Sequence, residues 1–177
     1  MKAGIRAIAW FVLKWLIRIR FPIVKRLTTT ELAHQLESDV DSTNGQHPIL
    51  LDARTFEEYQ VSHLPGARWV DMNDPVDYLL DYGQGDRLNS PSPPSVVIYC
   101  SIGYRSAQLT QQLQARGHKN VVNLEGSIFA WINENRPVYR NATPVCDIHP
   151  YHDAWKWLLN PNSHPTTQIP PSRRPNK

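Results

Sequence analysis

The chain has 177 residues, which favours one domain with extensions and allows a core large enough to need no disulfide or metal. Two cysteines exclude a disulfide framework and fit a reducing, cytoplasmic compartment. Residues 28–170 hold nine basic and sixteen acidic side chains, so the net charge of +3 comes from the two ends, and the acidic body argues against nucleic-acid binding.

The first predicted element is an amphipathic helix within residues 1–22. Residues 1–27 contain seven Lys or Arg and no Asp or Glu. On a helical wheel, one uncharged face holds Ile5, Ile8, Ala9, Phe11, Val12, Trp15, Leu16 and Ile19. The other half carries the basic residues Lys2, Arg6, Lys14, Arg18 and Arg20. Pro22 ends the helix.

This helix allows two interpretations. Basic amphipathic helices with tryptophans are typical of segments that lie in a membrane interface, which would make residues 1–21 a peripheral membrane contact. Alternatively, the apolar face packs on the protein's own domain or on a partner protein. The uncharged run from Ala7 to Leu13 is far shorter than the ~20 residues that a membrane span needs.

Strands and helices then alternate along the chain. A short edge strand is expected at 23–27, followed by a helix whose capping box begins at Thr28. A polar loop at 38–47 precedes a buried strand at 49–51, and a short helix is expected at 55–60. These elements begin a single domain that we place at residues 23–140.

The middle of the chain is less regular. A turn at 64–67 leads to a short strand at 69–70, and a helix is expected at 76–82. The Pro/Ser-rich stretch 89–95 is predicted to be a loop.

The regular alternation returns with an apolar strand at 96–100. A tight loop, Cys100 to Ser106, separates it from a helix at 107–116, and Gly117 is a suitable residue to end that helix. A buried strand at 121–124 and a helix capped by Ser127 follow. The alternation predicts an α/β fold in three layers, with a mostly parallel central sheet and helices on both faces.

Two segments follow the domain. Residues 141–160 form an extension in which Trp155, Trp157, Leu158 and Leu159 could make a short helix that docks on the domain. Residues 161–177 are rich in Pro, Asn, Ser and Thr, which indicates a disordered tail.

The loop between the strand and the helix suggests nucleophilic chemistry. A thiol at a helix N-terminus ionises more easily, and the thiolate is the reactive form. Gly103 can adopt a positive φ, so that successive N–H groups point inward and cradle an anion. Arg105 can meet an oxyanion with a planar set of donors, and Ser106 is expected to be the N-cap.

Three segments resemble the rhodanese family of sulfurtransferases in its single-domain form. The first comprises Leu51-Asp52-Ala53-Arg54, Glu58-Tyr59 and Ser62-His63-Leu64-Pro65-Gly66-Ala67. The second is Val97-Ile98-Tyr99-Cys100-Ser101-Ile102-Gly103-Tyr104-Arg105-Ser106-Ala107, and the third is Val122-Asn123-Leu124-Glu125-Gly126 with Ala130-Trp131. Two serines, Ser62 and Ser127, stand where the family usually has glycine.

The resemblance implies a rhodanese-like fold and a sulfurtransferase that uses thiosulfate as donor and, in an assay, cyanide as acceptor. Cys100 would be the catalytic nucleophile and would carry the sulfur as a persulfide. The substrate-binding residues would be Ser101, Ile102, Gly103, Tyr104, Arg105 and Ser106. A thiol or a protein would be the acceptor in a cell, and neither a cofactor nor a metal would be needed.

Two other functions fit the same loop. Phosphatases of this fold also use a cysteine and an arginine, but the resemblance gives them one residue more than the four between Cys100 and Arg105. The second alternative is a carrier or binding module that accepts persulfide sulfur without turnover.

Other polar residues have structural interpretations. Asp52 and Arg54 are expected to form a salt bridge or cap rather than an active-site pair, and His63 is expected to pack near the turn at 64–67. Cys146, His149 and His152 match no metal template.

Overall fold

The computed structural model of the chain describes residues 2–38, 47–75 and 94–161. Most of the predicted polar loop at 38–47, the predicted helix at 76–82, most of the Pro/Ser-rich loop at 89–95 and the tail after residue 161 lie outside the described residues.

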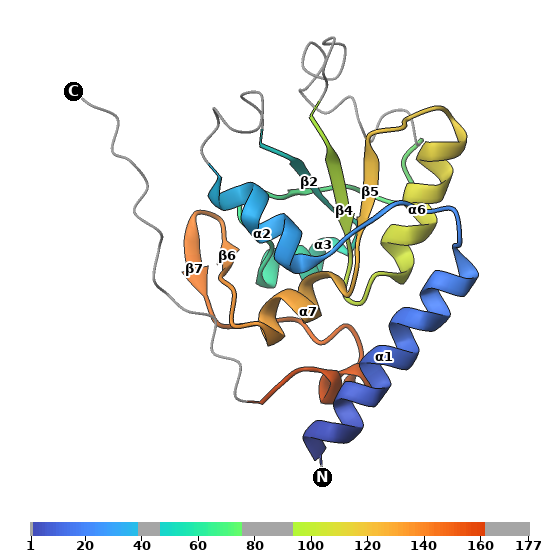
Figure 1. Cartoon of the computed structure of the whole chain (residues 1–177). Helices are drawn as coiled ribbons and strands as arrows, with labels where there is room; N and C mark the ends of the chain where they lie inside the picture. The colour runs from blue at the N-terminus through green and yellow to red at the C-terminus, as the bar shows by residue number, and fades with distance from the viewer. Residues whose placement is uncertain (1, 39–46, 76–93, 162–177) are drawn as a thin grey trace, which may run out of the picture.

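A five-stranded parallel sheet forms the centre of the domain, in the order β1-β5-β4-β2-β3 (Figure 1). Its strands are β1 (Arg26–Leu27), β2 (Ile49–Asp52), β3 (Arg68–Trp69), β4 (Val96–Tyr99) and β5 (Val121–Leu124). Because the strands are parallel, the residues that follow β2, β4 and β5 lie together at the carboxyl end of the sheet. The predicted α/β fold is confirmed, and so is the position of β1 at an edge of the sheet.

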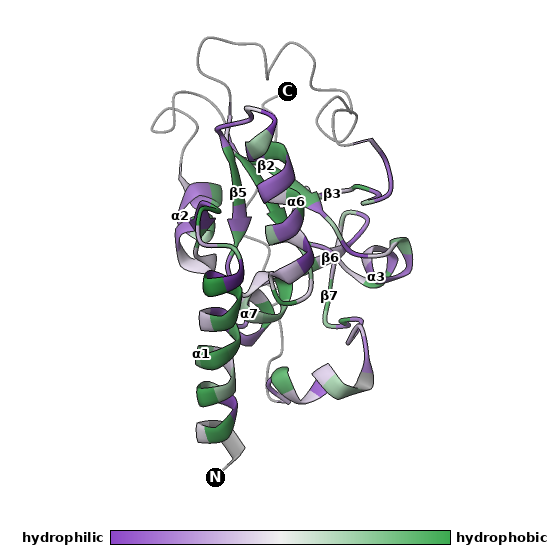
Figure 2. Ribbon diagram, turned by 90° about the vertical axis from the view of Figure 1, so that its right-hand side faces the viewer, coloured by the Kyte–Doolittle hydropathy of each residue, from purple (hydrophilic) through white to green (hydrophobic). Residues whose placement is uncertain are grey.

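Helices cover both faces of the sheet. On one face, α2 (Thr29–Glu37) and α7 (Ser127–Asn133) pack on Leu50 and Val97. On the other face, α6 (Tyr104–Ala115) packs on Leu51 and Ile98. Figure 2 shows the sheet between α2 and α6. Successive side chains of a strand point to opposite faces of the sheet, so each face is apolar and is covered by helices. This arrangement gives the three layers.

Side-chain caps begin two of the helices. Thr28 forms the predicted capping box with Glu31 at the start of α2. Thr55 forms another with Glu58 at the start of α3 (Phe56–Val61), which follows β2. In both boxes the threonine hydroxyl accepts from a backbone N–H and the glutamate accepts from the threonine N–H.

A glycine precedes each of α6 and α7, and here the sequence prediction is wrong. Gly103, at φ 103°, is the residue before α6, so that helix starts at Tyr104 and Ser106 lies within its first turn. Gly126, at φ 75°, likewise precedes α7, which begins with Ser127. A left-handed residue turns the chain sharply, so each helix starts nearer to its strand than the serine caps suggested.

A hairpin that the sequence did not indicate follows α7. Its antiparallel strands are β6 (Val138–Arg140) and β7 (Thr143–Val145). Backbone hydrogen bonds join Tyr139 to His63 and attach the hairpin to the domain.

The N-terminal helix α1 (Lys2–Arg20) docks on the domain with the face opposite to the predicted apolar one. Ile17 and Phe21 are buried, and Trp10 and Leu13 pack on the core. At the edge of this contact, Arg18 forms a bidentate ion pair with Glu125, at 2.7 and 3.0 Å.

The predicted apolar face of α1 is exposed. Except for the partly buried Ala9, its side chains retain between 43% (Val12) and 72% (Phe11) of their accessible surface. The interpretation in which this face packs on the protein's own domain is therefore wrong. None of the helices among the described residues is long and apolar enough to cross a membrane.

The 3-10 helix η2 (Asp153–Leu158) lies beside α1 near the N-terminus (Figure 1). Arg6 Nε donates to the Trp157 carbonyl at 3.0 Å, and Trp10 Nε1 donates to the Leu158 carbonyl at 3.2 Å. The Leu158 side chain is buried in the main core, which is the apolar cluster on the side of the sheet that α2 and α7 cover.

Candidate active site

Cys100 follows β4, at the carboxyl end of the sheet. Its side chain is buried, and its backbone N–H donates to Ser127 Oγ at 3.1 Å. In the first turn of α7, the N–H groups of Ile128 and Phe129 donate to the carbonyls of Cys100 and Ser101, at 3.2 and 3.1 Å. Hydrogen bonds from α7 thus hold the start of the loop, and the end of the loop continues directly into α6.

Hydrogen-bond donors converge on the sulfur of Cys100. The Gly103 N–H lies 3.2 Å from Sγ, and Ser106 Oγ lies 3.5 Å from it. Burial raises the pKa of the Cys100 thiol, but the charge of Arg105 and hydrogen bonds from Ser106 and Gly103 lower it more. The net pKa lies below its ordinary value, which favours the nucleophilic thiolate.

Arg105 makes its hydrogen bonds away from the sulfur. Its guanidinium forms a two-pronged ion pair with Glu58, at 2.9 and 3.1 Å, and donates to Ser101 Oγ at 2.9 Å. The ring of Tyr151 lies 4.5 Å from the guanidinium carbon. Arg105 therefore contributes a positive charge to the site while bracing the loop.

Glu58 is the buried partner of this arginine. The Ser101 hydroxyl also donates to Glu58 Oε1, at 2.8 Å. Burial raises the pKa of Glu58, but Arg105, together with hydrogen bonds from Thr55 and Ser101, lowers it more, so the net pKa is below its ordinary value. The carboxylate is therefore ionised and links α3 to the loop.

The remaining loop residues have different surroundings. Ile102 is partly buried against the main core. Tyr104 is half exposed, and its ring packs edge-on against Phe21, with 5.2 Å between the centroids. The structure thus places donors from Gly103 and Ser106 at the sulfur and leaves Ile102 and Tyr104 as apolar surface around it.

A cavity of about 240 Å³ opens onto Cys100. Its other lining residues are Leu13, Ser101, Ile102, Tyr104, Arg105, Tyr151 and Trp155. Leu13 comes from α1, whereas Tyr151 and Trp155 come from the segment that contains η2. Most of these side chains are hydrocarbon or aromatic, so the sulfur faces a space with largely apolar walls.

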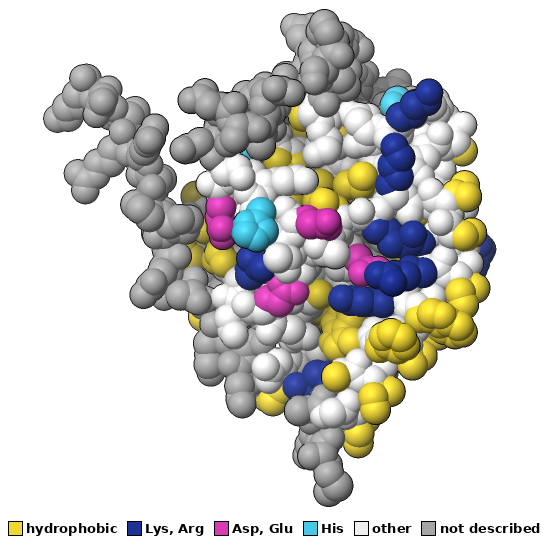
Figure 3. Space-filling model, viewed as in Figure 1, with side chains coloured by type: hydrophobic (Ala, Val, Ile, Leu, Met, Phe, Trp, Pro, Cys, Tyr) yellow, Lys and Arg dark blue, Asp and Glu magenta, His cyan; other side chains and the backbone are white. Residues whose placement is uncertain are grey.

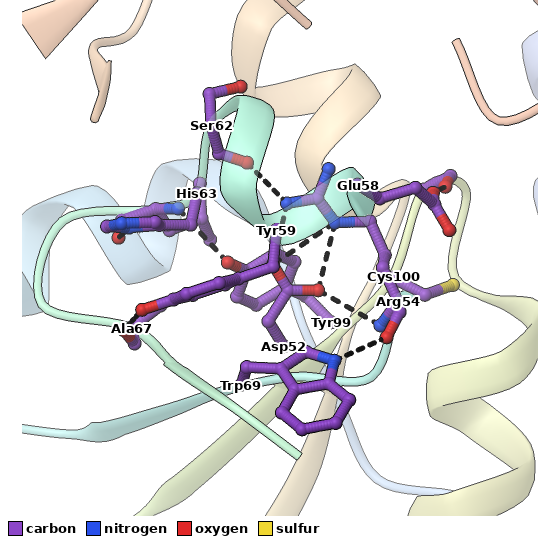
Figure 4. Close-up of polar contacts among 12 residues, drawn as sticks. Asp52, Arg54, Glu58, Tyr59, Ser62, His63, Ala67, Trp69, Tyr99 and Cys100 are labelled. Carbon is purple, nitrogen blue, oxygen red and sulfur yellow. Dashed lines mark hydrogen bonds and ion pairs between the residues drawn. The ribbon is translucent and has the colours of Figure 1, made fainter. Parts of the chain in front are cut away.

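The pair of Asp52 and Arg54 is structural, as predicted. Both side chains are fully buried, and Arg54 Nη2 lies 2.6 Å from Asp52 Oδ2. Figure 4 shows Arg54 between Asp52 and the Ser62 carbonyl, with the Cys100 sulfur pointing away from the pair. His63 stacks on Tyr59 at 4.4 Å and contacts the Leu64 carbonyl, so it packs beside the turn as expected.

The two serines that replace glycines occupy different backbone conformations. Ser127 has φ 53°, in the left-handed region, and its hydroxyl also donates to the Leu124 carbonyl at 3.0 Å. Ser62 is extended, and its buried hydroxyl donates to the Asp147 carbonyl at 2.6 Å. Ser127 is therefore a strained residue whose side chain supports the backbone at Cys100.

The histidines near the C-terminal side of the domain act as backbone caps. His149 Nδ1 accepts from the Tyr151 N–H, and His152 Nδ1 accepts from the Ala154 N–H, both at 3.1 Å. Within residues 2–38, 47–75 and 94–161, no group of three or more His, Cys, Asp or Glu is arranged to hold a metal ion.

Sequence reasoning missed four residues of the site. Glu58 lies in the first of the segments that resemble the family, but nothing in the sequence identified Arg105 as its partner. Leu13, Tyr151 and Trp155 lie outside the resemblance, and no local pattern places them at Cys100.

Residues 30–134 match the model of the rhodanese-like domain. Thiosulfate sulfurtransferase 18 of Arabidopsis thaliana is 30% identical over 98 residues, which are 50% of this chain and 69% of that protein. An adenylyltransferase and sulfurtransferase of Meyerozyma guilliermondii is 27% identical over 104 residues, covering 57% of this chain and 24% of that protein.

The chain therefore spans about a quarter of the length of such two-function relatives. Among solved structures, thiosulfate sulfurtransferase from Pseudomonas aeruginosa has a TM-score of 0.56 at 24% identity, and the match covers 71% of this chain and 22% of that one. That likeness concerns the fold.

Proposed function

Because the chain belongs to the rhodanese-like domain family, we propose that it is a sulfurtransferase in which Cys100 carries sulfane sulfur from an anionic donor such as thiosulfate to a thiophilic acceptor. The observation that carries this proposal is the buried thiol with a lowered pKa, which receives hydrogen bonds from Gly103 and Ser106 and faces a cavity. Two relatives whose names include sulfurtransferase support the same reaction class.

The first step is attack of the Cys100 thiolate on the outer sulfur of thiosulfate. The new sulfur–sulfur bond forms on Cys100, the old one breaks, and its electron pair leaves with sulfite. The persulfide keeps one negative charge, which the N–H groups of the loop can stabilise. The positive charge of Arg105 would lie close to the donor, although the guanidinium makes its hydrogen bonds to Glu58 and Ser101.

The second step regenerates the thiolate. A nucleophile such as cyanide or a thiolate attacks the terminal sulfur of the persulfide, and the electron pair of the broken bond returns to Cys100. Thiocyanate or a new persulfide is the product. The donor product leaves before the acceptor reacts, so the scheme predicts ping-pong kinetics.

Mass spectrometry of the protein after thiosulfate treatment tests this function. We expect a gain of one sulfur on Cys100 that cyanide removes, a loss of this gain in Cys100→Ala, and its retention in the matched control Cys146→Ser. Turnover to thiocyanate separates an enzyme from a carrier that is loaded once. If no sulfur is gained and phosphate esters are hydrolysed, the phosphatase alternative is correct instead.

We also propose that the protein works in the cytoplasm at an anionic membrane surface, which α1 contacts peripherally. Seven large apolar side chains on one face of α1 are exposed, from Ile5 to Ile19. Residues 1–27 carry only basic charge, and Figure 3 shows Lys and Arg side chains gathered beside the apolar edge at the lower right. Apolar burial combined with attraction to anionic headgroups is how such helices bind membranes.

Flotation with phosphatidylserine-containing vesicles tests the membrane contact. We expect the full chain to float and the triple variant Ile8→Ser, Phe11→Ser, Trp15→Ser to remain at the bottom. A control variant, Trp157→Ser, removes an exposed tryptophan outside α1 and should float like the unmodified chain. Equal recovery of all three proteins would disprove the contact.

A further inference from the structure

The walls of the Cys100 cavity come from two sources. Cys100, Ser101, Ile102, Tyr104 and Arg105 belong to the loop and to the first turn of α6. Leu13, Tyr151 and Trp155 come from α1 and from the segment around η2, both of which lie outside the region that matches the family model. The space in front of the sulfur is therefore shaped by parts of the chain that the catalytic domain itself does not contain.

Hydrogen bonds hold this covering in place. Arg6 and Trp10 of α1 donate to the carbonyls of Trp157 and Leu158. Asn133 of α7 donates to the Leu158 carbonyl at 2.8 Å, and the Asn160 N–H donates to Asn133 at 2.6 Å. Trp155 also packs against the main core. Leu13 and Trp155 are thus fixed walls of the cavity and not chance neighbours of the sulfur.

Charge in the cavity is limited. Arg105 is the one cationic side chain among its lining residues, and both of its terminal nitrogens already bond to Glu58. A dianion such as thiosulfate would have to lose water on entering a cavity with apolar walls, and the guanidinium of Arg105 is already paired with Glu58. A monoanion with an apolar body would lose less hydration, and its body would gain contact with Leu13 and Trp155.

Resting on the proposed sulfur transfer, we infer that Leu13 and Trp155 determine donor specificity and that the cavity favours a monoanionic organic sulfur donor with a compact apolar body, such as a thiosulfonate. In the first step the Cys100 thiolate attacks the terminal sulfur of the thiosulfonate. The bond between the two donor sulfurs breaks, and its electron pair leaves on the organic sulfinate. One negative charge remains on the persulfide and one on the sulfinate, so neither an oxidant nor a reductant is required.

Steady-state formation of thiocyanate from cyanide tests the inference with three donors: thiosulfate, methanethiosulfonate and benzenethiosulfonate. Because the donors differ in intrinsic reactivity, the informative quantity is the change in kcat/KM that a substitution causes for each donor. The variants are Leu13→Ala and Trp155→Ala. The matched control is Trp157→Ala, which truncates a half-exposed tryptophan of the same 3-10 helix that does not line the cavity.

We expect Trp155→Ala to lower kcat/KM for benzenethiosulfonate about tenfold, which corresponds to about 1.4 kcal/mol. The loss should be smaller for methanethiosulfonate and smallest for thiosulfate, which has no apolar body to contact Trp155. For Leu13→Ala, the losses of kcat/KM should follow the same order of donors. Trp157→Ala should leave kcat/KM unchanged for all three donors. Urea unfolding of each variant, compared with the unmodified protein, shows whether it is folded.

An equal loss for all three donors, or no loss for benzenethiosulfonate, would overturn the specificity inference and leave the sulfur-transfer proposal intact. If the unmodified protein produced no thiocyanate from any donor, the proposed function itself would be wrong. The two failures are therefore distinguishable in one experiment.

Discussion

Both terminal nitrogens of Arg105 face the Glu58 carboxylate, at 2.9 and 3.1 Å. The carboxylate is buried, whereas the arginine side chain is partly exposed. This pair joins α3 to the first turn of α6 across the loop that carries Cys100. The arginine of the motif thus acts on the thiol through its charge and through the position of the loop, because its hydrogen bonds are directed elsewhere.

The Glu58–Arg105 pair predicts a pH-dependent contribution to stability. Glu58 has a lowered pKa in the folded protein, so its stabilisation is fully present above the unfolded value of about 4.3 and is lost as the pH falls through the lower folded value. Glu58→Gln should reduce the free energy of unfolding by about 1–3 kcal/mol at pH 7.

Urea unfolding from pH 7 to pH 3 measures this contribution. The difference between the unmodified protein and Glu58→Gln should shrink as the pH falls below the unfolded value of about 4.3. Glu57→Gln is the matched control, since Glu57 is its exposed neighbour on α3. A difference that stayed constant with pH would mean that Glu58 is not ionised in the folded state.

Ser106→Ala should raise the pKa of Cys100. The hydroxyl at 3.5 Å from Sγ is one of the groups that stabilise the thiolate, and alanine removes it. The pH profile of alkylation by iodoacetamide, measured in a Cys146→Ser background, reports this pKa directly. In that background the midpoint should lie below the ordinary value of a cysteine thiol and should move to higher pH in Ser106→Ala. An unmoved midpoint would show that the Ser106 hydroxyl does not act on the sulfur.

Two substitutions of Ser127 should differ in stability. Ser127→Ala loses the hydroxyl that accepts from the Cys100 N–H and donates to the Leu124 carbonyl, while the φ of 53° remains unfavourable. Ser127→Gly loses the same bonds but removes the strain, which is about 1 kcal/mol. Thermal or urea unfolding should therefore rank the unmodified protein first, glycine second and alanine last. If alanine equalled glycine, the left-handed backbone would carry no cost.

The two phenylalanines of the N-terminal segment should have opposite effects. Phe21 is 1% exposed and Phe11 is 72% exposed. Phe21→Ala should reduce the free energy of unfolding by about 3–5 kcal/mol, and Phe11→Ala should change it by less than about 0.5 kcal/mol. In vesicle flotation the order should reverse, with Phe11→Ala causing the greater loss. Similar unfolding energies for both variants would mean that α1 is not docked as described.

The regular part of the fold could be predicted because its signals are local. The runs at 49–51 and 96–99 are buried on both faces of the sheet, and the run at 121–124 is buried except for the partly buried Val122. Such runs identify parallel strands. The Thr28 capping box likewise states where α2 begins. The starts of α6 and α7 were misplaced because Ser106 and Ser127 resemble caps, whereas the left-handed glycines before each helix set its start.

The site was only partly predictable for a different reason. Cys100, Gly103 and Arg105 lie close together in the sequence, so their spacing is informative. The contact of Arg105 with Glu58 spans 47 positions, and Leu13 and Trp155 meet at the cavity from opposite ends of the chain. Such contacts depend on tertiary packing. The wheel of α1 likewise identified an apolar face but not that Trp10, Leu13 and Ile17 form the docking side.

The junction of α1 with η2 has a consequence for how this protein can diversify. The proposed nucleophile Cys100 and its loop lie within 30–134, whereas Leu13, Tyr151 and Trp155 lie before and after that range. Mutations in the flanking segments can reshape the space over the sulfur without altering the loop that activates it. The proposed specificity therefore predicts that grafting these flanks onto another domain of the family transfers donor selectivity and leaves the reactivity of the thiol unchanged.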